Sequence, residues 1–293
     1  MSSAPARGDF APVLICAFTY AFAVVCARIA FEDGSNTATV VLLRCAFAAL
    51  AVGASLAIRP AGRVLAAADR NFILLLGVLF AVNVYAFYRS IEILRIPLAI
   101  LIFYSYPLLT ILFSAMAGLE RMTPAVIACA LLTLVGLALA TGASPETLDP
   151  MGVALALGAG ASIAFLLVVT TRRLGHVDAR QRTFWTMVST TVLLGLGMLA
   201  ASNLQWPDSA RGLLAIAGVC GFYAIGVVML FASATRIGPA RTATIMTLEP
   251  VIAIALSTAL LGQGLTIVQL IGGLLVITGV TAAQWVRRAG TGD

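Results

Sequence analysis

The chain is 293 residues long, with 61% hydrophobic residues, 10% charged residues and a net charge of +6. Its mean hydropathy is +1.05. Soluble domains carry about 25% charged residues, so a soluble fold of this size could not cover its surface, and the surrounding medium must be largely lipid. Only helices and closed barrels span a bilayer, and barrel strands alternate over about 10 residues. The runs here are longer and apolar all round, which predicts helices.

Ten segments have the roughly 20 mostly apolar residues that a spanning helix requires. In chain order they are Phe10–Ala30, Thr37–Ile58, Asn71–Leu94, Pro97–Gly118, Pro124–Ala143, Pro150–Thr171, Thr183–Ser202, Gly212–Thr235, Pro239–Leu261 and Thr266–Val286. Four of them begin at proline, where a missing N–H does no harm. The first lacks a tidy signal-peptide cleavage site, so we expect it to be retained. We therefore predict an all-α membrane protein with ten transmembrane helices.

The arginines predict the orientation of these helices. All 18 basic residues are arginines, and with the N-terminus inside the cell 13 of them fall in inner segments. The outer segments then hold four, Arg28, Arg89, Arg95 and Arg211, while Arg44 lies within a span. Short cytoplasmic loops are enriched in arginine, which favours an N-in/C-in topology. Because topology accounts for the positive charge, we expect no nucleic-acid partner.

The two halves of the chain resemble each other. Three landmarks keep register at an offset of 143 residues: Pro107 and Pro250, Glu120 and Gln263, Gly136 and Gly279. Each half holds five predicted helices, an odd number, so the second half enters the membrane upside down. Inverted repeats with a site near the midplane are typical of secondary transporters. We predict five-helix repeats at residues 10–143 and 150–286 around a central cavity.

Two ionisable residues lie deep within predicted spans, where charges are costly and face a cavity or a partner. Glu249 lies about 15 Å along its helix, and Pro250 should bend the helix there. Glu249 is a candidate for a proton-coupling or amine-binding carboxylate; the alternative is a buried acid bonded to the helix break or paired with an arginine. Arg44 lies about 10 Å from the outer end of its span and is a candidate for binding a substrate carboxylate.

Further charges stand at the outer ends of the first and third spans. Arg28, Arg89 and Glu92 are candidates for an outer gate. Arg89 and Glu92 are three residues apart and share a helix face, so they can pair. The alternative for this group is snorkelling at the membrane interface.

Four of the six tyrosines lie in the third and fourth spans. The full set of candidate substrate-binding residues is Arg44, Asn83, Tyr85, Tyr88, Phe103, Tyr106, Tyr223 and Met246. Asn83 and Tyr106 are deep, where an unpartnered amide or hydroxyl is unfavourable, so they should line a polar cavity or bond across helices. A membrane-belt role is the alternative for Tyr88, and simple packing is the alternative for Tyr223 and Met246.

The sequence lacks the motifs of the common enzyme classes. It has no HExxH, no phosphate-binding glycine loop before a lysine, and no paired carboxylates. The single histidine, His176, falls in a predicted inner loop, and the five cysteines show no metal or disulfide spacing. We therefore expect no enzyme activity, no metal and no cofactor. The expected partners are a small-molecule substrate and the lipid bilayer, and the chain is compatible with a monomer.

Several of these features together resemble a known family. They are the ten spans in two halves, the prolines that follow the third and eighth spans, the element Leu248-Glu249-Pro250-Val251, the acid or amide at Glu120 and Gln263, and the closing glycines. This pattern resembles the drug/metabolite transporter superfamily, EamA type, over about residues 10–286. Gln263 departs from the acidic residue common there, and we expect little consequence at a helix end.

The resemblance implies a secondary exporter of amino acids or related metabolites in a bacterial inner membrane, working by alternating access. Within the family the chain is most similar to amino-acid exporters of the YddG type, whose substrates include neutral and aromatic amino acids. Transport of nucleotide sugars or drugs is an alternative. A nucleotide-sugar carrier should have several cationic side chains deep in its cavity, and the sequence provides only Arg44. A channel or receptor without coupled transport is another alternative. A channel should show a repeated filter or charge ring, and none is visible in the sequence.

Overall fold

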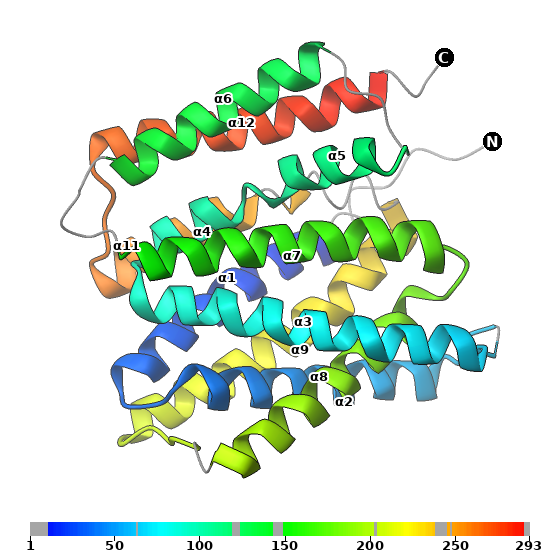
Figure 1. Ribbon diagram of the computed structural model, residues 1–293. Coiled ribbons are helices and arrows are strands. Elements are labelled where there is room, and N and C mark those ends of the chain that lie inside the picture. The colour runs from blue at the N-terminus through cyan, green and yellow to red at the C-terminus, as the bar shows by residue number, and fades with distance from the viewer. Residues whose placement is uncertain are drawn as a thin grey trace. The chain divides into compact units, whose positions relative to one another are not determined.

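The computed structural model describes residues 11–62, 64–118, 124–142, 149–201, 204–237, 245–246 and 248–289. Over these residues the regular secondary structure is helical (Figure 1). The helices are α1 Ala11–Glu32, α2 Thr37–Ile58, α3 Ala67–Ile93, α4 Ile96–Phe103, α5 Tyr106–Met116, α6 Pro124–Gly142, α7 Pro150–Leu174, α8 Ala179–Ala201, α9 Ala210–Ile237, α11 Leu248–Leu261 and α12 Ile267–Ala289. Glu120 and Pro239, used above, lie outside the described residues.

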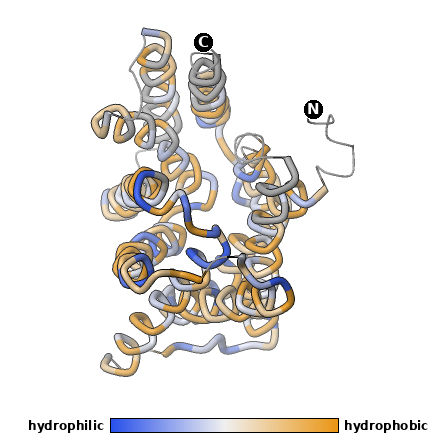
Figure 2. The backbone as a smooth tube through the Cα atoms, turned by 90° about the vertical axis from the view of Figure 1, so that its right-hand side faces the viewer, coloured by the Kyte–Doolittle hydropathy of each residue, from blue (hydrophilic) through white to orange (hydrophobic). Residues whose placement is uncertain are grey.

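Six of the described helices are each long and apolar enough to cross a membrane: α1, α2, α3, α7, α8 and α9. In Figure 2 hydrophobic residues predominate along the helices, and hydrophilic ones gather in connecting segments. Large apolar side chains such as Leu50, Leu199 and Leu214 are exposed on the helices. Apolar side chains on the outside of a helix suit a hydrocarbon environment, so the chain is a multi-pass membrane protein.

Polar residues at the helix ends set where several helices begin. Asn36 caps α2 by accepting a hydrogen bond from the backbone N–H three residues on, at 2.9 Å. Asp149 accepts the N–H of Met151 at the start of α7, at 2.7 Å. Thr266 and Gln269 exchange hydrogen bonds of 3.0 and 3.2 Å in a capping box before α12. Side-chain caps of this kind satisfy N–H groups that a helix leaves unpaired.

The chain divides into two compact units, each drawn from both halves of the sequence. The first comprises Met1–Tyr85 and Leu174–Leu256, and the second Ala86–Arg173 and Ser257–Asp293. Within the first unit α1 packs along α9, and α2 packs against α8 and α9. Within the second unit α6 packs along α12 (Figure 1). Small residues let helices approach closely in lipid.

The contact between α6 and α12 is reciprocal under the 143-residue offset. Gly136 of α6 packs against Gly272 and Val276, and Gly279 of α12 packs against Cys129 and Thr133. Adding 143 to 129, 133 and 136 gives 272, 276 and 279. Each half therefore offers the same three positions to the other, as in contacts across a two-fold axis.

Two loop contacts in the first unit show the same reciprocity. Asp33, after α1, accepts hydrogen bonds from the N–H and hydroxyl of Ser209 and from the N–H of Gly212, at the start of α9. His176, after α7, lies 2.9 Å from Asp69 in the first turn of α3. Adding 143 to 33 and 69 gives 176 and 212. The contact between residues 33 and 212 therefore has a counterpart in the contact between residues 176 and 69.

Candidate functional site

A helix break divides the fourth predicted span. The sequence predicted one helix over Pro97–Gly118, but α4 ends at Phe103 and α5 begins at Tyr106. Pro107 has no N–H to offer the carbonyl of Phe103, so the regular hydrogen-bond ladder is interrupted there. The single-helix prediction was therefore wrong in detail, because hydropathy measures length and polarity and not the continuity of hydrogen bonds.

In the second half a helix begins at the matching position. α11 begins at Leu248 after a turn at Met246, whose carbonyl accepts the N–H of Glu249 at 3.0 Å. Pro250, where the sequence predicted a bend, lies in the first turn of α11. At the 143-residue offset Glu249 corresponds to Tyr106. A carboxylate and a phenol thus occupy equivalent places in the first turns of α11 and α5.

Aromatic side chains gather at the first break, inside the second unit. The ring centroid of Phe103 lies 4.3 Å from that of Phe87, 5.3 Å from Tyr106 and 6.0 Å from Tyr104. Phe87 also contacts Tyr88 edge to face, with centroids 5.7 Å apart. Such tilted and edge-to-face pairs are the favoured geometries for aromatic rings. Three predicted candidates, Tyr88, Phe103 and Tyr106, therefore share one aromatic cluster.

Arg44 is buried in the first unit, where it stacks on a ring. Its side chain belongs to a residue only 6% exposed, and the guanidinium carbon lies 3.7 Å from the centroid of the Tyr223 ring. Tyr223 in turn stacks on Tyr20, with centroids 5.3 Å apart and an interplanar angle of 22°. A desolvated cation over a ring face gains about 2 kcal/mol. The predicted candidates Arg44 and Tyr223 thus form one cluster, to which the structure adds Tyr20.

Glu249 lies in the same neighbourhood. The charges of Glu249 and Arg44 both act on Tyr20, and that of Glu249 also acts on Cys16 of α1. Glu249 itself is half-buried. Within the first unit, α1, α2, α9 and the first part of α11 therefore supply a cation, a carboxylate and two phenols. We refer to Tyr20, Arg44, Tyr223 and Glu249 as the charged cluster.

Three other predicted pocket residues are not among the residues that define these clusters. Asn83 of α3 is 4% exposed, whereas Tyr85 two residues later is 40% exposed. Met246 is half-buried at the turn before α11. The ring and charge contacts that define the two clusters do not include these three residues, and a role in binding stays a prediction for each.

The predicted gate residues pair within their own helices. Arg89 Nη1 lies 2.7 Å from Glu92 Oε2, which confirms the predicted pair, and Arg28 Nε lies 2.9 Å from Glu32 Oε1. All four side chains are partly exposed. Pairs of this kind on one helix face stabilise it by only about 0.3–0.5 kcal/mol. Their part in a gate stays a prediction.

Tyr20 and Ser105 were missed from the sequence. Tyr20 fits against α9 because residue 226 is glycine, and a Cβ there would overlap the ring. The feature of the sequence that could have pointed to Tyr20 was this glycine, one turn after the aromatic Tyr223. Ser105 is 5% exposed at the α4–α5 break, and its signal was a polar residue two positions before the mid-span Pro107.

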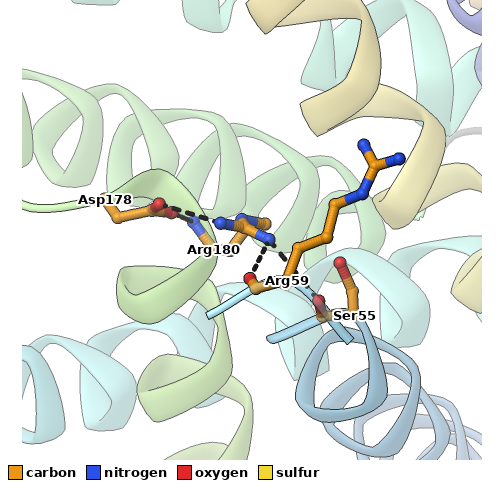
Figure 3. A network of polar contacts seen from close by, with 4 residues as sticks. All are labelled: Ser55, Arg59, Asp178 and Arg180. Carbon is orange, nitrogen blue, oxygen red and sulfur yellow. Dashed lines mark hydrogen bonds and ion pairs between the residues drawn. The ribbon is translucent and has the colours of Figure 1, made fainter. Parts of the chain in front are cut away.

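Arg180, in the first turn of α8, contacts both the loop before α8 and the end of α2 (Figure 3). Its Nη1 donates to the carbonyls of Arg59 at 2.8 Å and Ser55 at 3.5 Å, and its Nη2 lies 3.2 Å from Asp178 Oδ2. A guanidinium there satisfies the last carbonyls of the helix and complements its dipole. Burial tends to raise the pKa of Asp178, but hydrogen bonds and charge from Arg180 hold this pKa below its usual value.

Comparison with known proteins shows a family match over each half of the chain. The EamA-like transporter family matches residues 10–142 and again residues 150–283. The chain belongs to the EamA-like transporter family. Since the family is made up of transporters, the EamA-like chain is placed among membrane transporters, as its apolar helices also indicate.

Individual relatives agree with this assignment. The EamA-like chain is 27% identical over 209 residues to the threonine/homoserine exporter RhtA of Escherichia coli K12, covering 70% of this chain and 68% of the relative. It is also 27% identical over 197 residues to RhtA of Salmonella typhimurium LT2, covering 66% and 64%. A crystal structure of a further protein superposes with a TM-score of 0.64 over 95% of this chain and 98% of the other, at 17% identity, which concerns the fold alone.

Proposed function

We propose that this EamA-like chain is a secondary transporter that exports small neutral amino acids, hydroxylated ones such as threonine and homoserine included, across a bacterial inner membrane by alternating access. The similarity to RhtA exporters of two bacteria supports the substrate class. The sequence indicated neutral or aromatic amino acids as substrates. This proposal keeps only the small neutral ones.

The proposed architecture is ten spans in two inverted five-helix repeats, with both termini in the cytoplasm. In this scheme α4 and α5 together form one interrupted span. The reciprocal contacts between α6 and α12, and between the loops of the first unit, support a two-fold relation between the halves. The break between α4 and α5, and the start of α11 at the matching position, are a further support, since interrupted helices mark the binding region in many inverted-repeat transporters.

The observation that carries the proposal is the charged cluster. Arg44 presents a planar guanidinium, which matches a carboxylate with two parallel hydrogen bonds. Glu249 presents the opposite charge, which suits either the ammonium of an amino acid or a proton. Tyr20 lies within the electrostatic reach of both. We propose that Arg44 takes the substrate carboxylate and that Glu249 exchanges a proton for the substrate ammonium, which would couple export to proton entry.

Transport by the purified protein tests the proposal. Proteoliposomes are loaded on one side with labelled L-threonine, L-homoserine or L-phenylalanine, and movement is followed with and without a pH gradient. We expect the first two to move faster than in protein-free liposomes and to respond to the gradient. The variant Arg44→Ala should abolish this movement, whereas Arg172→Ala, which removes an exposed arginine in the last turn of α7, should keep it. Rates equal to those of protein-free liposomes for every amino acid would end the proposal.

A further inference from the structure

Three helices of the first unit, α2, α3 and α8, are held together at one end. Arg180 of α8 donates to the carbonyl of Arg59, the residue after α2, at 2.8 Å. Arg70 of α3 lies over the ring of Trp185 of α8, with its guanidinium carbon 5.8 Å from the ring centroid. Each of the three helices is long and apolar enough to cross a membrane, so this shared end lies where the bilayer meets water.

Two arginines at this end have no acidic partner among the residues that the structure describes. Arg59 and Arg70 are both exposed, and neither belongs to an ion pair within that part of the chain. Figure 3 shows the side chain of Arg59 pointing away from Arg180 and Asp178, so its carbonyl joins that network and its guanidinium does not. Both guanidinium groups can therefore bind an anion from outside the chain.

The two arginines approach the same part of α8. Arg180, which contacts Arg59, and Trp185, which contacts Arg70, lie about 8 Å apart along the helix. A guanidinium group is planar and matches a phosphate with two parallel hydrogen bonds. Arg59 and Arg70 thus flank the first two turns of α8 with groups that suit a phosphate.

Trp185 is held in place between the two arginines by aromatic packing. The ring of Phe184 meets that of Trp185 edge to face, with centroids 5.4 Å apart. Phe184 in turn packs against Gly53 of α2, where a Cβ would lie 2.9 Å from its ring. Trp185 is half-buried and lies about 9 Å from the start of α8. Tryptophan is enriched at this level of a membrane, where headgroups and acyl chains meet.

Apolar side chains continue from this end along the span. The exposed ones of α3 recur at helical spacing on one face: Leu75, Val78 and Val82. Ile58, directly before Arg59, is exposed as well. Arginines at the membrane surface beside an apolar helix face match the two parts of an anionic phospholipid, its phosphate and its acyl chains. A soluble anion would use the arginines alone.

The opposite end of the unit has the reverse balance of charge. At the end described above, arginines outnumber aspartates among the described residues: Arg59, Arg70, Arg180 and Arg182 against Asp69 and Asp178. At the other end, where α1 stops and α9 starts, acids outnumber arginines among them: Glu32, Asp33 and Asp208 against Arg28 and Arg211. Basic clusters beside spanning helices attract anionic lipids, so an anionic headgroup is favoured at the first of these ends.

We propose that Arg59, Arg70 and Trp185 form a docking site for an anionic phospholipid. The two guanidinium groups bind the headgroup phosphate, Trp185 lies at the level of the glycerol, and the acyl chains run along the exposed face of α3. The site requires only that α2, α3 and α8 span the bilayer, so it is independent of what the chain transports. In the proposed topology this end faces the cytoplasm.

The test uses the full chain with Trp185 as its single tryptophan, after Trp206→Phe and Trp285→Phe. The protein is reconstituted in phosphatidylcholine bilayers, and phosphatidylglycerol or phosphatidylcholine with brominated acyl chains is titrated in. Bromine quenches the fluorescence of a tryptophan that it contacts, so quenching reports the lipid beside Trp185. We expect a preference for phosphatidylglycerol of roughly 10- to 30-fold, from the two arginines together.

Three variants and a control locate the preference. Arg59→Gln keeps the carbonyl that Arg180 binds, and it should lower the preference roughly fivefold, as should Arg70→Gln. Arg70→Lys keeps the charge and should retain most of the preference. The control is Arg211→Gln, which makes the same change of charge at an exposed arginine of the opposite end and should match the parent.

Several outcomes would overturn the docking site. A parent that is quenched equally by the two lipids has no site for an anionic headgroup. A loss of preference in Arg211→Gln as large as in Arg59→Gln would assign the effect to net charge, and a loss in Arg70→Lys as large as in Arg70→Gln would assign it to the fold. Displacement of brominated phosphatidylglycerol by inorganic phosphate alone would show that a soluble anion, and not a lipid, occupies the arginines.

Discussion

The variant Gly226→Ala tests whether the stack of Tyr20 on Tyr223 supports the charged cluster. Gly226 lies in α9, one turn after Tyr223, and the ring of Tyr20 from α1 packs directly against it. An alanine Cβ would overlap two ring carbons of Tyr20 and would lie 2.8 Å from Thr19 Oγ1. Tyr20 is held in a close helix–helix contact, so the substitution must displace its ring and move α1 away from α9.

The expected cost follows from these contacts. Overpacking a tight site costs about 1–3 kcal/mol, and the lost stack between Tyr20 and Tyr223 adds about 0.5–1.5 kcal/mol. Alanine also raises helix propensity by about 1 kcal/mol relative to glycine, which offsets part of the cost. The net loss is therefore about 0.5–3.5 kcal/mol. Since Arg44 rests on the Tyr223 ring, which loses its stacking partner Tyr20, we expect a KM for threonine raised by roughly tenfold, on the scale of a cation–π contact.

The control is Gly221→Ala on the same helix, where a Cβ would have no atom within 4 Å. It carries the same gain in helix propensity without the overlap. Melting temperature in detergent and threonine KM in proteoliposomes are measured for both variants. Gly226→Ala should melt lower and bind more weakly than Gly221→Ala. Equal melting temperatures and equal KM values would refute the reasoning that Tyr20 orders this site.

Three further predictions concern charged residues. Arg44→Lys keeps the charge but loses the planar stack on Tyr223, so threonine KM should rise roughly 3- to 30-fold, and an unchanged KM would remove Arg44 from binding. Glu249→Gln should abolish transport driven by a pH gradient and spare exchange of amino acids; an unchanged pH dependence would assign Glu249 to structure. The hydrogen bond from Ser209 is the main cause that lowers the pKa of Asp33, so its stabilisation is present above the unfolded pKa of about 3.9 and is lost as pH falls through the folded one. Asp33→Asn should accordingly lower the melting temperature at pH 7, with the difference from the parent closing below about pH 4; a gap independent of pH would contradict this.

The helices were largely predictable from the sequence, because their signal is local. A run such as Thr37–Ile58 is apolar throughout and begins after Asn36, and α2 has those same bounds. Pro124 and Pro150 likewise begin α6 and α7 as predicted. The pairing of Arg89 with Glu92 followed from spacing on one helix face. The interruption between α4 and α5 was missed because the run stays apolar through Pro107, and hydropathy does not register a lost hydrogen bond.

The candidate site was only partly predictable, because it depends on which helices become neighbours. Arg44 and Tyr223 were chosen for their depth and chemistry, but their contact joins α2 to α9 across most of the chain length. Tyr20 was passed over because it lies in a largely apolar run, and its importance comes from Gly226 on another helix. The contact of Asp33 with Gly212 is equivalent to that of His176 with Asp69. This equivalence could be found only after the structure showed which loops meet.

Labelling of single cysteines from each side of the membrane tests the inverted-repeat architecture most directly. In a protein without its native cysteines, exposed positions are replaced one at a time: Gly62 after α2, Gly175 after α7 and Asp208 before α9. A membrane-impermeant thiol reagent is then applied to intact cells and to inside-out vesicles. The account predicts that cysteines at 62 and 175 react only from the cytoplasmic side and the cysteine at 208 only from outside. Reaction of the cysteines at 62 and 175 from opposite sides would contradict it.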